Sequence, residues 1–304
     1  MKSMKLPCID LSEQNTNLLS KSVADACKEW GFFTLKNHGI RLEDVQVLFK
    51  QSDEFFKLPS EEKEKYVFHG SDLPSGYSRH QGEGVYSQKP QYRAVKEYYD
   101  IAEIPNSNPE GLSQSFRERL PELKLFQRQC YSLSLRILEL IALGFEIPKD
   151  TYSKHHSSTE DFLRFIEYMV PEGKGHVQDD VDTDSHFDYG TITLLFQRDY
   201  GCLQIQPPQT QGFSNPEWVR VSVDKEVISV NVSDMLEFWT GGKIKSTVHQ
   251  IKIDPHIRER QMIAYFSVPD LDFPITGYFD EGDGKKEKTM TMREFRKESS
   301  SRQP

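Results

Sequence analysis

The sequence predicts an α+β protein with a mostly β core, a double-stranded β-helix of the jelly-roll, cupin-like kind, flanked by N-terminal helices. In the first half of the 304-residue chain, apolar residues recur with the spacing of amphipathic helices. From residue 163 onward, short runs rich in β-branched and aromatic residues follow one another, separated by turn residues. No repeat or shift of composition divides the two parts, so we expect one domain.

The N-terminal part reads mainly as amphipathic helices. Each has apolar residues on one face and a start or stop signal at an end, such as the glycine at position 31 or the proline at position 59. In order, the predicted elements are a helix at 18–30, a strand at 32–35, a helix at about 42–57, a short helix from 59 and a long helix at about 115–143.

The C-terminal part reads as strands, and many short strands at this spacing are typical of a jelly roll or barrel. The predicted strands cover residues 163–170, 191–197, 202–206, 218–221, 228–232, 237–239, 247–253 and 261–268. Within a single domain over 1–304, we expect a helical and β region over about 1–110, the jelly-roll core over about 160–270 and a C-terminal extension over about 271–304.

The bulk composition indicates a globular protein, because 36% of its residues are hydrophobic. The net charge of −9 argues against nucleic acid or an anionic membrane as a partner, since either needs a basic surface. No apolar run is long enough for a signal peptide or a membrane span. The four scattered cysteines favour free thiols in a reducing compartment. We therefore expect a cytoplasmic monomer with a small-molecule substrate.

A histidine and an aspartate two residues apart, together with a distant histidine, form a candidate metal site. In extended backbone, His186 and Asp188 project from the same face and can reach one ion. His249 lies in a strand-like run and shares a face with apolar Ile251. Two imidazoles and one carboxylate on one face of an octahedron leave three positions open, as in non-haem Fe(II) oxygenases. Alone, however, the tripeptide is a weak signal, and a lone His249 is more often a core histidine.

Arg260 follows His249 in the next strand-like run and is a candidate anion anchor. A buried arginine needs a partner, because an unpaired buried charge is very costly. Its planar fork suits bidentate binding of the distal end of a dicarboxylate. A structural salt bridge is the alternative interpretation.

Short motifs in a fixed order extend this pattern along nearly the whole chain. The N-terminal ones are Leu6-Pro7-Cys8-Ile9-Asp10-Leu11, Trp30-Gly31-Phe32-Phe33, Asn37-His38-Gly39-Ile40 and Phe55-Phe56-Lys57-Leu58-Pro59. The C-terminal ones are His186-x-Asp188, Gly201-Cys202-Leu203-Gln204, Asp234-Met235-Leu236, Trp239-Thr240-Gly241-Gly242 and Ser246-Thr247-Val248-His249. Together they resemble the isopenicillin-N-synthase-like, plant-type Fe(II)/2-oxoglutarate dioxygenases. The likeness is closest to the microbial ethylene-forming-enzyme branch, through Ser75-Gly76-Tyr77, the segment 142–148 and Arg258-Glu259-Arg260.

The resemblance also implies which residues contact the cosubstrate, with two departures from the family pattern. The family usually has Arg-x-Ser for the distal carboxylate, whereas Arg260-Gln261-Met262 lacks the serine, as the ethylene-forming branch does. The Asn-x-Tyr of plant members becomes Ile166-Glu167-Tyr168, so only Tyr168 matches. Arg164 falls where the ethylene-forming branch has an arginine near the cosubstrate. Arg260, Tyr168 and Arg164 are therefore the expected cosubstrate contacts.

By the same resemblance, His186, Asp188 and His249 hold Fe(II), and no catalytic residue beyond these ligands is implied. 2-Oxoglutarate and O2 occupy the open positions, and ascorbate is a possible reductant. 2-Oxoglutarate is converted to succinate and CO2 while a C–H bond of the substrate is oxidised, by hydroxylation, desaturation or oxidative cyclisation. Ethylene release is also known in such folds. A role in secondary metabolism fits this chemistry.

Expected substrate contacts come from the segment between Gly76 and Tyr98 and from the surroundings of the metal. They are Tyr77, Arg79, Tyr86, Arg93, Tyr189, Trp239, Lys243 and Phe266. The basic ones suit a carboxylate-bearing, amino-acid-derived substrate, although each candidate is equally an exposed charge or a core aromatic. Two alternatives remain: an oxidase of the same fold that ignores 2-oxoglutarate, and a catalytically silent β-sandwich that binds metal or ligand. Substrate oxidation without succinate would support the oxidase, and loss of iron-dependent 2-oxoglutarate turnover would support the silent protein.

Overall fold

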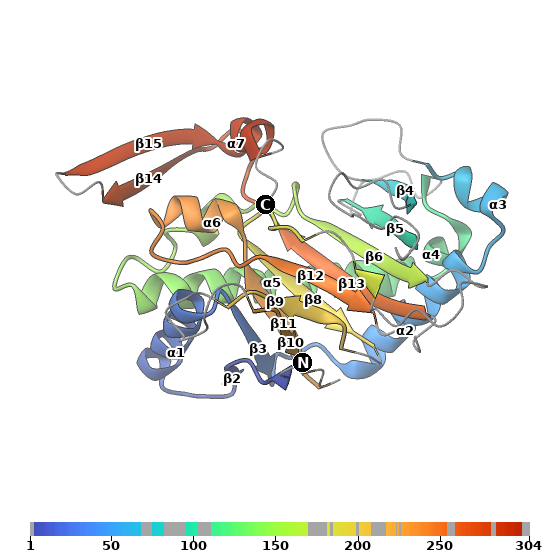
Figure 1. Ribbon diagram of the computed structural model, residues 1–304, viewed down its shortest axis with the longest axis horizontal. Helices are drawn as coiled ribbons and strands as arrows, with labels where there is room; N and C mark the ends of the chain where they lie inside the picture. Colours follow the sequence, from blue (N-terminus) through green and yellow to red (C-terminus); the bar gives the residue numbers. More distant parts are fainter. Residues whose placement is uncertain are drawn as a thin grey trace.

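Two β-sheets share an apolar layer at the centre of the molecule, and helices cover the outer face of the larger sheet (Figure 1). The computed structural model describes residues 3–67, 75–81, 95–102, 111–169, 181–182, 185–198, 201–207, 217–222, 224, 226–253, 259–280 and 284–299. Within these residues no helix is both long and apolar enough to cross a membrane. All four cysteines are free thiols, as the sequence predicts.

The larger sheet has eight strands in the described part of the chain. Their order is β2 (Cys8–Asp10), β3 (Phe32–Lys36), β11 (Ile228–Val232), β8 (Ile192–Gln197), β13 (Glu259–Ser267), β6 (Phe162–Met169), β5 (Val95–Ile101) and β4 (Gly76–Gln81). The smaller sheet has the order β1 (Ser3–Met4), β10 (Val219–Val221), β9 (Leu203–Ile205), β12 (His249–Ile253) and β7 (Val181–Asp182).

The large sheet is buried on both faces, which explains why its strands read as nearly continuous apolar runs. In β13, Met262 and Ala264 join the layer between the two sheets. Ile263 and Tyr265, on the opposite face, join the main core beneath the helices. Successive side chains of a strand point to opposite faces, so each residue has a defined side. We call the face toward the second sheet the inner face.

Helices supply the outer layer. They are α1 (Thr16–Glu29), α2 (Leu42–Phe56), α3 (Ser60–Glu64), α4 (Gln114–Arg117) and α5 (Leu120–Gly144). The short helix α6 (Asp234–Trp239) follows β11 and contributes Met235 and Phe238 to a separate apolar cluster. The N-cap of α1 is Asn15, whose side chain accepts a hydrogen bond from Leu18 N. Where α5 ends, Gly144 lies against α1, and a Cβ there would stand 2.5 Å from the Cβ of Ala24. The missing side chain therefore allows the two helices to approach.

The C-terminal extension forms a hairpin of β14 (Pro274–Asp280) and β15 (Lys285–Thr291), followed by α7 (Met292–Ser299), at one end of the body (Figure 1). Ile275, Met292 and Phe295 are buried in a third apolar cluster, with Phe162 and residues of α6. Apolar burial therefore attaches the extension to the end of β6.

Most predicted elements are confirmed, and one is wrong. The predicted helices correspond to α1, α2, α3 and α5, and the predicted α+β class with a mostly β core is confirmed. Glu237–Trp239, predicted as a strand, is instead the end of α6. Ser233 and Asp234 begin this helix, and Gly241 and Gly242, both with positive φ, follow its end. Strands β4, β5, β14 and β15 were not predicted.

Gly31 ties α1 and β3 to the segment that precedes β12, and we expect Gly31→Ala to destabilise the protein strongly. Its φ is +64°, and a Cβ would stand 2.2 Å from the carbonyl oxygen of Lys245 and 2.4 Å from Oγ1 of Thr247. The strained φ alone costs about 1–2 kcal/mol, and the clash with backbone adds to it. Chemical unfolding measures the loss. Gly39→Ala is the matched control, because φ there is +84° but a Cβ meets nothing within 4 Å. Equal losses in the two variants would contradict this account.

Candidate metal centre

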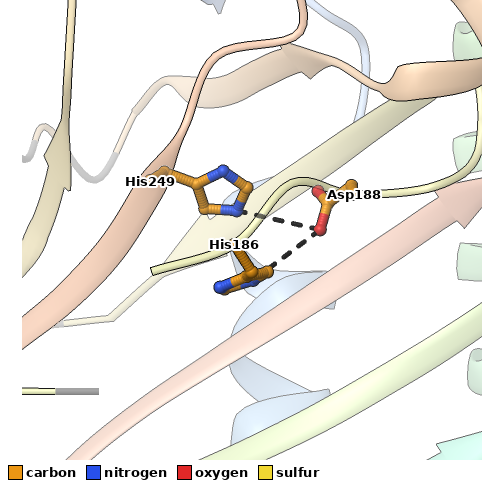
Figure 2. A group of neighbouring side chains, drawn as sticks. All are labelled: His186, Asp188 and His249. Atoms are coloured by element: carbon orange, nitrogen blue, oxygen red, sulfur yellow. Dashed lines mark ion pairs between the residues drawn. The ribbon is translucent and has the colours of Figure 1, made fainter. Parts of the chain in front are cut away.

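His186 and Asp188, two residues apart in the sequence, meet the distant His249 at the start of β12 (Figure 2). One ligand atom from each of His186, Asp188 and His249 lies within 4.8 Å of the others. Oδ1 of Asp188 is 3.7 Å from Nε2 of His249 and 3.9 Å from Nε2 of His186. Two backbone hydrogen bonds, of 3.0 and 3.1 Å, join His186 and His249 across an isolated β-bridge. The register of this bridge places the two imidazoles side by side.

The hydrogen bonds of His249 leave one ring nitrogen for a metal. Nδ1 lies 3.2 Å from the carbonyl oxygen of Thr247, which requires the hydrogen on Nδ1. Nε2, with its lone pair, then faces Asp188 and His186. The edge of the Phe32 ring, at 5.5 Å between centroids, packs against the imidazole and limits its rotation. The carbonyl of Thr247 is the kind of hydrogen-bond partner that orients metal-binding histidines.

The carboxylate of Asp188 is held in the same way. Oδ2 accepts hydrogen bonds from Oγ1 of Thr193 at 2.7 Å and from Nδ2 of Asn231 at 2.8 Å, which leaves Oδ1 directed at the histidines. Burial raises the pKa of Asp188, but the two imidazoles and these hydrogen bonds outweigh it, so the net shift is downward. The group is therefore an anion in the neutral range, as a metal ligand must be.

Thr193 and Asn231 were not predicted from the sequence. Both are polar residues at inner-face positions of mostly apolar strands, β8 and β11. A buried polar residue in such a run needs a hydrogen-bond partner, and that pattern is the signal that could have identified them.

Arg260 lies on the inner face of β13 and is 3% exposed, so its guanidinium is inside the protein. Nη2 donates to Oε1 of Gln197 at 2.8 Å, and Nη1 donates to Sδ of Met262 at 3.0 Å. Tyr168 is its register partner on β6, with its ring 5.6 Å from the guanidinium. Burial raises the pKa of Tyr168 to about 12, and the charges of Arg260, Arg164 and Asp188 also act on this hydroxyl. Arg260, Tyr168 and Arg164 therefore lie around the same interior region as Asp188.

Arg164 is held by an ion pair and by aromatic rings. Its Nε and Nη2 donate to the two carboxylate oxygens of Asp100 at 2.7 and 2.8 Å. The guanidinium lies 4.2 Å from the ring centre of Tyr98 and 5.6 Å from that of Phe266. Phe266 stacks on Phe162 at 4.5 Å, and Phe162 on Tyr189, the residue after Asp188, at 6.3 Å. We call Tyr98, Phe162, Phe266 and Tyr189 the aromatic wall.

The other predicted substrate contacts are not brought to this region. On β4, Tyr77 points into the main core against Phe55, and Arg79 lies 3.3 Å from Glu97, both on the helix side of the sheet. The parity of the strand pairing explains this, because Tyr98 and not Glu97 faces inward on β5. Trp239 ends α6 and packs against Tyr152. Lys243 is exposed beside Gly242. Tyr86 and Arg93 lie outside the described residues.

Comparisons with known proteins place this geometry in a family. Residues 161–269, which include the three candidate ligands and Arg260, match the 2OG-Fe(II) oxygenase superfamily. Residues 6–123 match the family described as non-haem dioxygenase in morphine synthesis N-terminal. The chain is 47% identical over 295 residues to UPF0676 protein C1494.01 of Schizosaccharomyces pombe, covering 97% of this chain and 91% of that protein.

Relatives with an assigned activity point the same way. The chain is 30% identical over 264 residues to the 2-oxoglutarate-dependent dioxygenase frbA of Dothideomycetidae sp. (strain 11243), covering 80% and 77% of the two chains. Its fold superposes with a TM-score of 0.81 on a full-length Neurospora crassa protein in complex with alpha-KG and thymine, at 25% identity and with 95% and 94% of the chains covered. The likeness to the ethylene-forming branch stays a prediction. The chain belongs to the 2OG-Fe(II) oxygenase superfamily, as an isopenicillin-N-synthase-like dioxygenase with a jelly-roll core that uses Fe(II), 2-oxoglutarate and O2.

Proposed function

We propose that His186, Asp188 and His249 hold the Fe(II), that Arg260 and Tyr168 hold the far carboxylate of 2-oxoglutarate, and that the enzyme oxidises a C–H bond of a small molecule. The observation that carries this proposal is the convergence of the three ligand atoms within 4.8 Å. Two imidazole nitrogens and one carboxylate oxygen are the donor set that suits Fe(II) with open positions. When bound, the iron supplies the redox chemistry that couples conversion of 2-oxoglutarate to succinate and CO2 with oxidation of the substrate.

The residues of the chain orient these groups. Thr193, Asn231 and the carbonyl of Thr247 fix two of the ligands in position before the metal arrives. The side chain of His186 is 43% exposed, whereas those of Asp188 and His249 are about 10% exposed, so access to the ion is from the His186 side. The buried surroundings of Asp188 and His249 keep water away from the opposite side.

Arg260 supports cosubstrate binding by its place and by its neighbours. Gln197 and Met262 orient the guanidinium, which can then form an ion pair with the far carboxylate of a bound dicarboxylate. Met262 stands where the family usually has serine, and its sulfur accepts from Nη1. The fork is thus fixed without the serine hydroxyl. A charge-assisted hydrogen bond inside the protein is stronger than one in water.

The aromatic wall supports a flat substrate that carries oxygen acceptors. Asp100 binds Nε and Nη2 of Arg164, and Nη1 donates to none of the described residues. The resemblance assigns Arg164 to the cosubstrate, whereas we propose that this nitrogen binds the substrate, through a carboxylate, as the amino-acid-derived class requires, or through a carbonyl oxygen. Because Asp100 already balances the charge, a neutral carbonyl suits the site as well as a carboxylate does. The similar Neurospora crassa structures hold thymine and 5-formyluracil, which are flat rings with carbonyl groups.

Succinate formation with a panel of compounds tests this proposal. With Fe(II) and 2-oxoglutarate, we expect flat carbonyl- or carboxylate-bearing rings to raise succinate formation above the substrate-free rate. Arg164→Lys should raise KM for such a compound about 10-fold or more, the value of one charge-assisted hydrogen bond, while Arg136→Lys on α5 should leave it unchanged. Substrate oxidation without succinate would instead support the 2-oxoglutarate-independent oxidase. Stimulation only by aliphatic amino acids would contradict the role of the wall.

A further inference from the structure

A cavity lies on the helix side of the large sheet, apart from the metal centre. Its volume is about 640 Å³, within the range of about 300–1,000 Å³ that small-molecule sites occupy. The floor consists of Ile40, Val45, Phe49, Phe196 and Ile228, all buried members of the main core. None of the three candidate metal ligands lines it. The cavity therefore offers a ligand an apolar surface that neither iron nor 2-oxoglutarate uses.

The charged groups at its edge favour a cation. Glu43 and Glu226 are exposed at the edge, and neither carboxylate forms an ion pair with a described residue. Asp53 is neutralised by Arg198, whose Nη1 lies 2.8 Å from both of its oxygens. Lys50 is the remaining cation of the lining, so the edge has an excess of negative charge. The net charge of −9 over the whole chain acts in the same direction.

Two residues of the lining also contact the strand that carries Arg260. Oε1 of Gln197 accepts from Nη2 of Arg260 at 2.8 Å. The next residue, Arg198, donates from Nη1 to Oε1 of Gln261, the neighbour of Arg260, at 3.1 Å. The end of β8 and the residue after it therefore line the cavity, and the same residues contact β13 through these hydrogen bonds. A ligand that shifts this strand end will shift Arg260 as well.

We propose that this cavity binds a small apolar molecule carrying one ammonium group, and that its occupancy changes the affinity for 2-oxoglutarate. The apolar floor takes the body of the molecule, and Glu43 and Glu226 take the ammonium group. The second half of the proposal rests on the proposed role of Arg260, whereas amine binding does not. Coupling between two sites is reciprocal, so 2-oxoglutarate changes amine affinity by the same factor.

Calorimetric titration with 3-phenylpropylamine, a cation, tests the binding site. 3-Phenylpropanol, which is neutral, and 3-phenylpropionate, an anion, carry the same phenyl group and serve as comparisons. The protein alone is used, without iron or 2-oxoglutarate, so the outcome is independent of the proposed function. We expect one amine to bind per chain, the alcohol to bind with lower affinity and the acid with the lowest affinity. Joint replacement Glu43→Gln and Glu226→Gln should weaken the amine at least about 2-fold, the value of exposed ion pairs, and leave the alcohol unchanged. Glu118→Gln on α4's C-terminal side is the matched control.

Two further variants locate the bound amine. Val227→Trp fills the cavity from its half-buried edge and should abolish binding, whereas His249→Ala should leave it unchanged. Tight binding of the acid, or binding that survives Val227→Trp and is lost in His249→Ala, would overturn the site. Saturating amine should change the Kd of 2-oxoglutarate, measured anaerobically with Fe(II), by at least about 5-fold, the lower end of allosteric couplings. An unchanged Kd for 2-oxoglutarate would overturn the regulatory half.

Discussion

Replacing His249 by alanine abolishes Fe(II) binding and, with it, 2-oxoglutarate turnover. Removing an outer partner of a metal ligand already costs about 10- to 100-fold in affinity, so removing a ligand itself should cost more than about 100-fold. The chain loses the imidazole that is fixed by Thr247 and Phe32, and two ligands remain. Anaerobic equilibrium titration with Fe(II) measures the loss.

A graded series of variants separates loss of a ligand from loss of fold. His155→Ala removes an imidazole that stacks on Phe273 at 3.4 Å and belongs to no described group of candidate ligands, so iron affinity should not change. Asn231→Leu removes one of the two hydrogen bonds to Asp188. Its iron affinity should fall by about 10- to 100-fold, which lies between the wild type and His249→Ala. Unchanged iron affinity in a folded His249→Ala protein would show that the three residues are not the metal site.

Replacing Arg260 by alanine weakens 2-oxoglutarate binding by about 10- to 150-fold, because a hydrogen bond to a charged group contributes about 1.5–3 kcal/mol. Iron affinity should stay the same, since Arg260 contacts Gln197 and Met262 and none of the three ligands. The Kd of 2-oxoglutarate, measured anaerobically with Fe(II) present, tests this expectation.

Two controls belong to that measurement. Arg260→Lys keeps the charge but loses the planar fork, so its Kd should fall between the wild type and Arg260→Ala. Arg136→Ala removes an exposed arginine that donates to the carbonyl of Leu11 in the N-terminal part of the protein, and should have no effect. If the Kd of 2-oxoglutarate is the same in Arg260→Ala as in the wild type, the anchor lies elsewhere.

The fold was predictable where burial follows hydrophobic pattern. Helices α1 and α2 and strands such as β11 carry their periodicity in the sequence, and turn residues mark their ends. Strand β5 escaped prediction because it contains buried charges, and its neighbour β4 because four of its six residues are polar or charged. Glu97 is 1% exposed but pairs with Lys63 and Arg79, and Asp100 pairs with Arg164. Only the three-dimensional pairing makes such residues compatible with a sheet interior.

The metal ligands of the candidate site could be predicted from the sequence more completely than its substrate contacts. The spacing of His186, Asp188 and His249, together with the order of motifs, identified the residues that the structure brings together. The substrate side was predicted less well, because which face of a strand lines the interior depends on its register. One step along β5 separates Tyr98 on the inner face from Glu97 on the helix side. The sequence of a polar strand does not fix that register.

Diffraction at the iron absorption edge, from crystals grown anaerobically with Fe(II) and 2-oxoglutarate, tests the central claim most directly. The account predicts one iron peak at bonding distance from Nε2 of His186, Oδ1 of Asp188 and Nε2 of His249. It also predicts the far carboxylate of 2-oxoglutarate within hydrogen-bond distance of the Arg260 guanidinium. Iron bound by other residues, or 2-oxoglutarate with its far carboxylate away from Arg260, would contradict it.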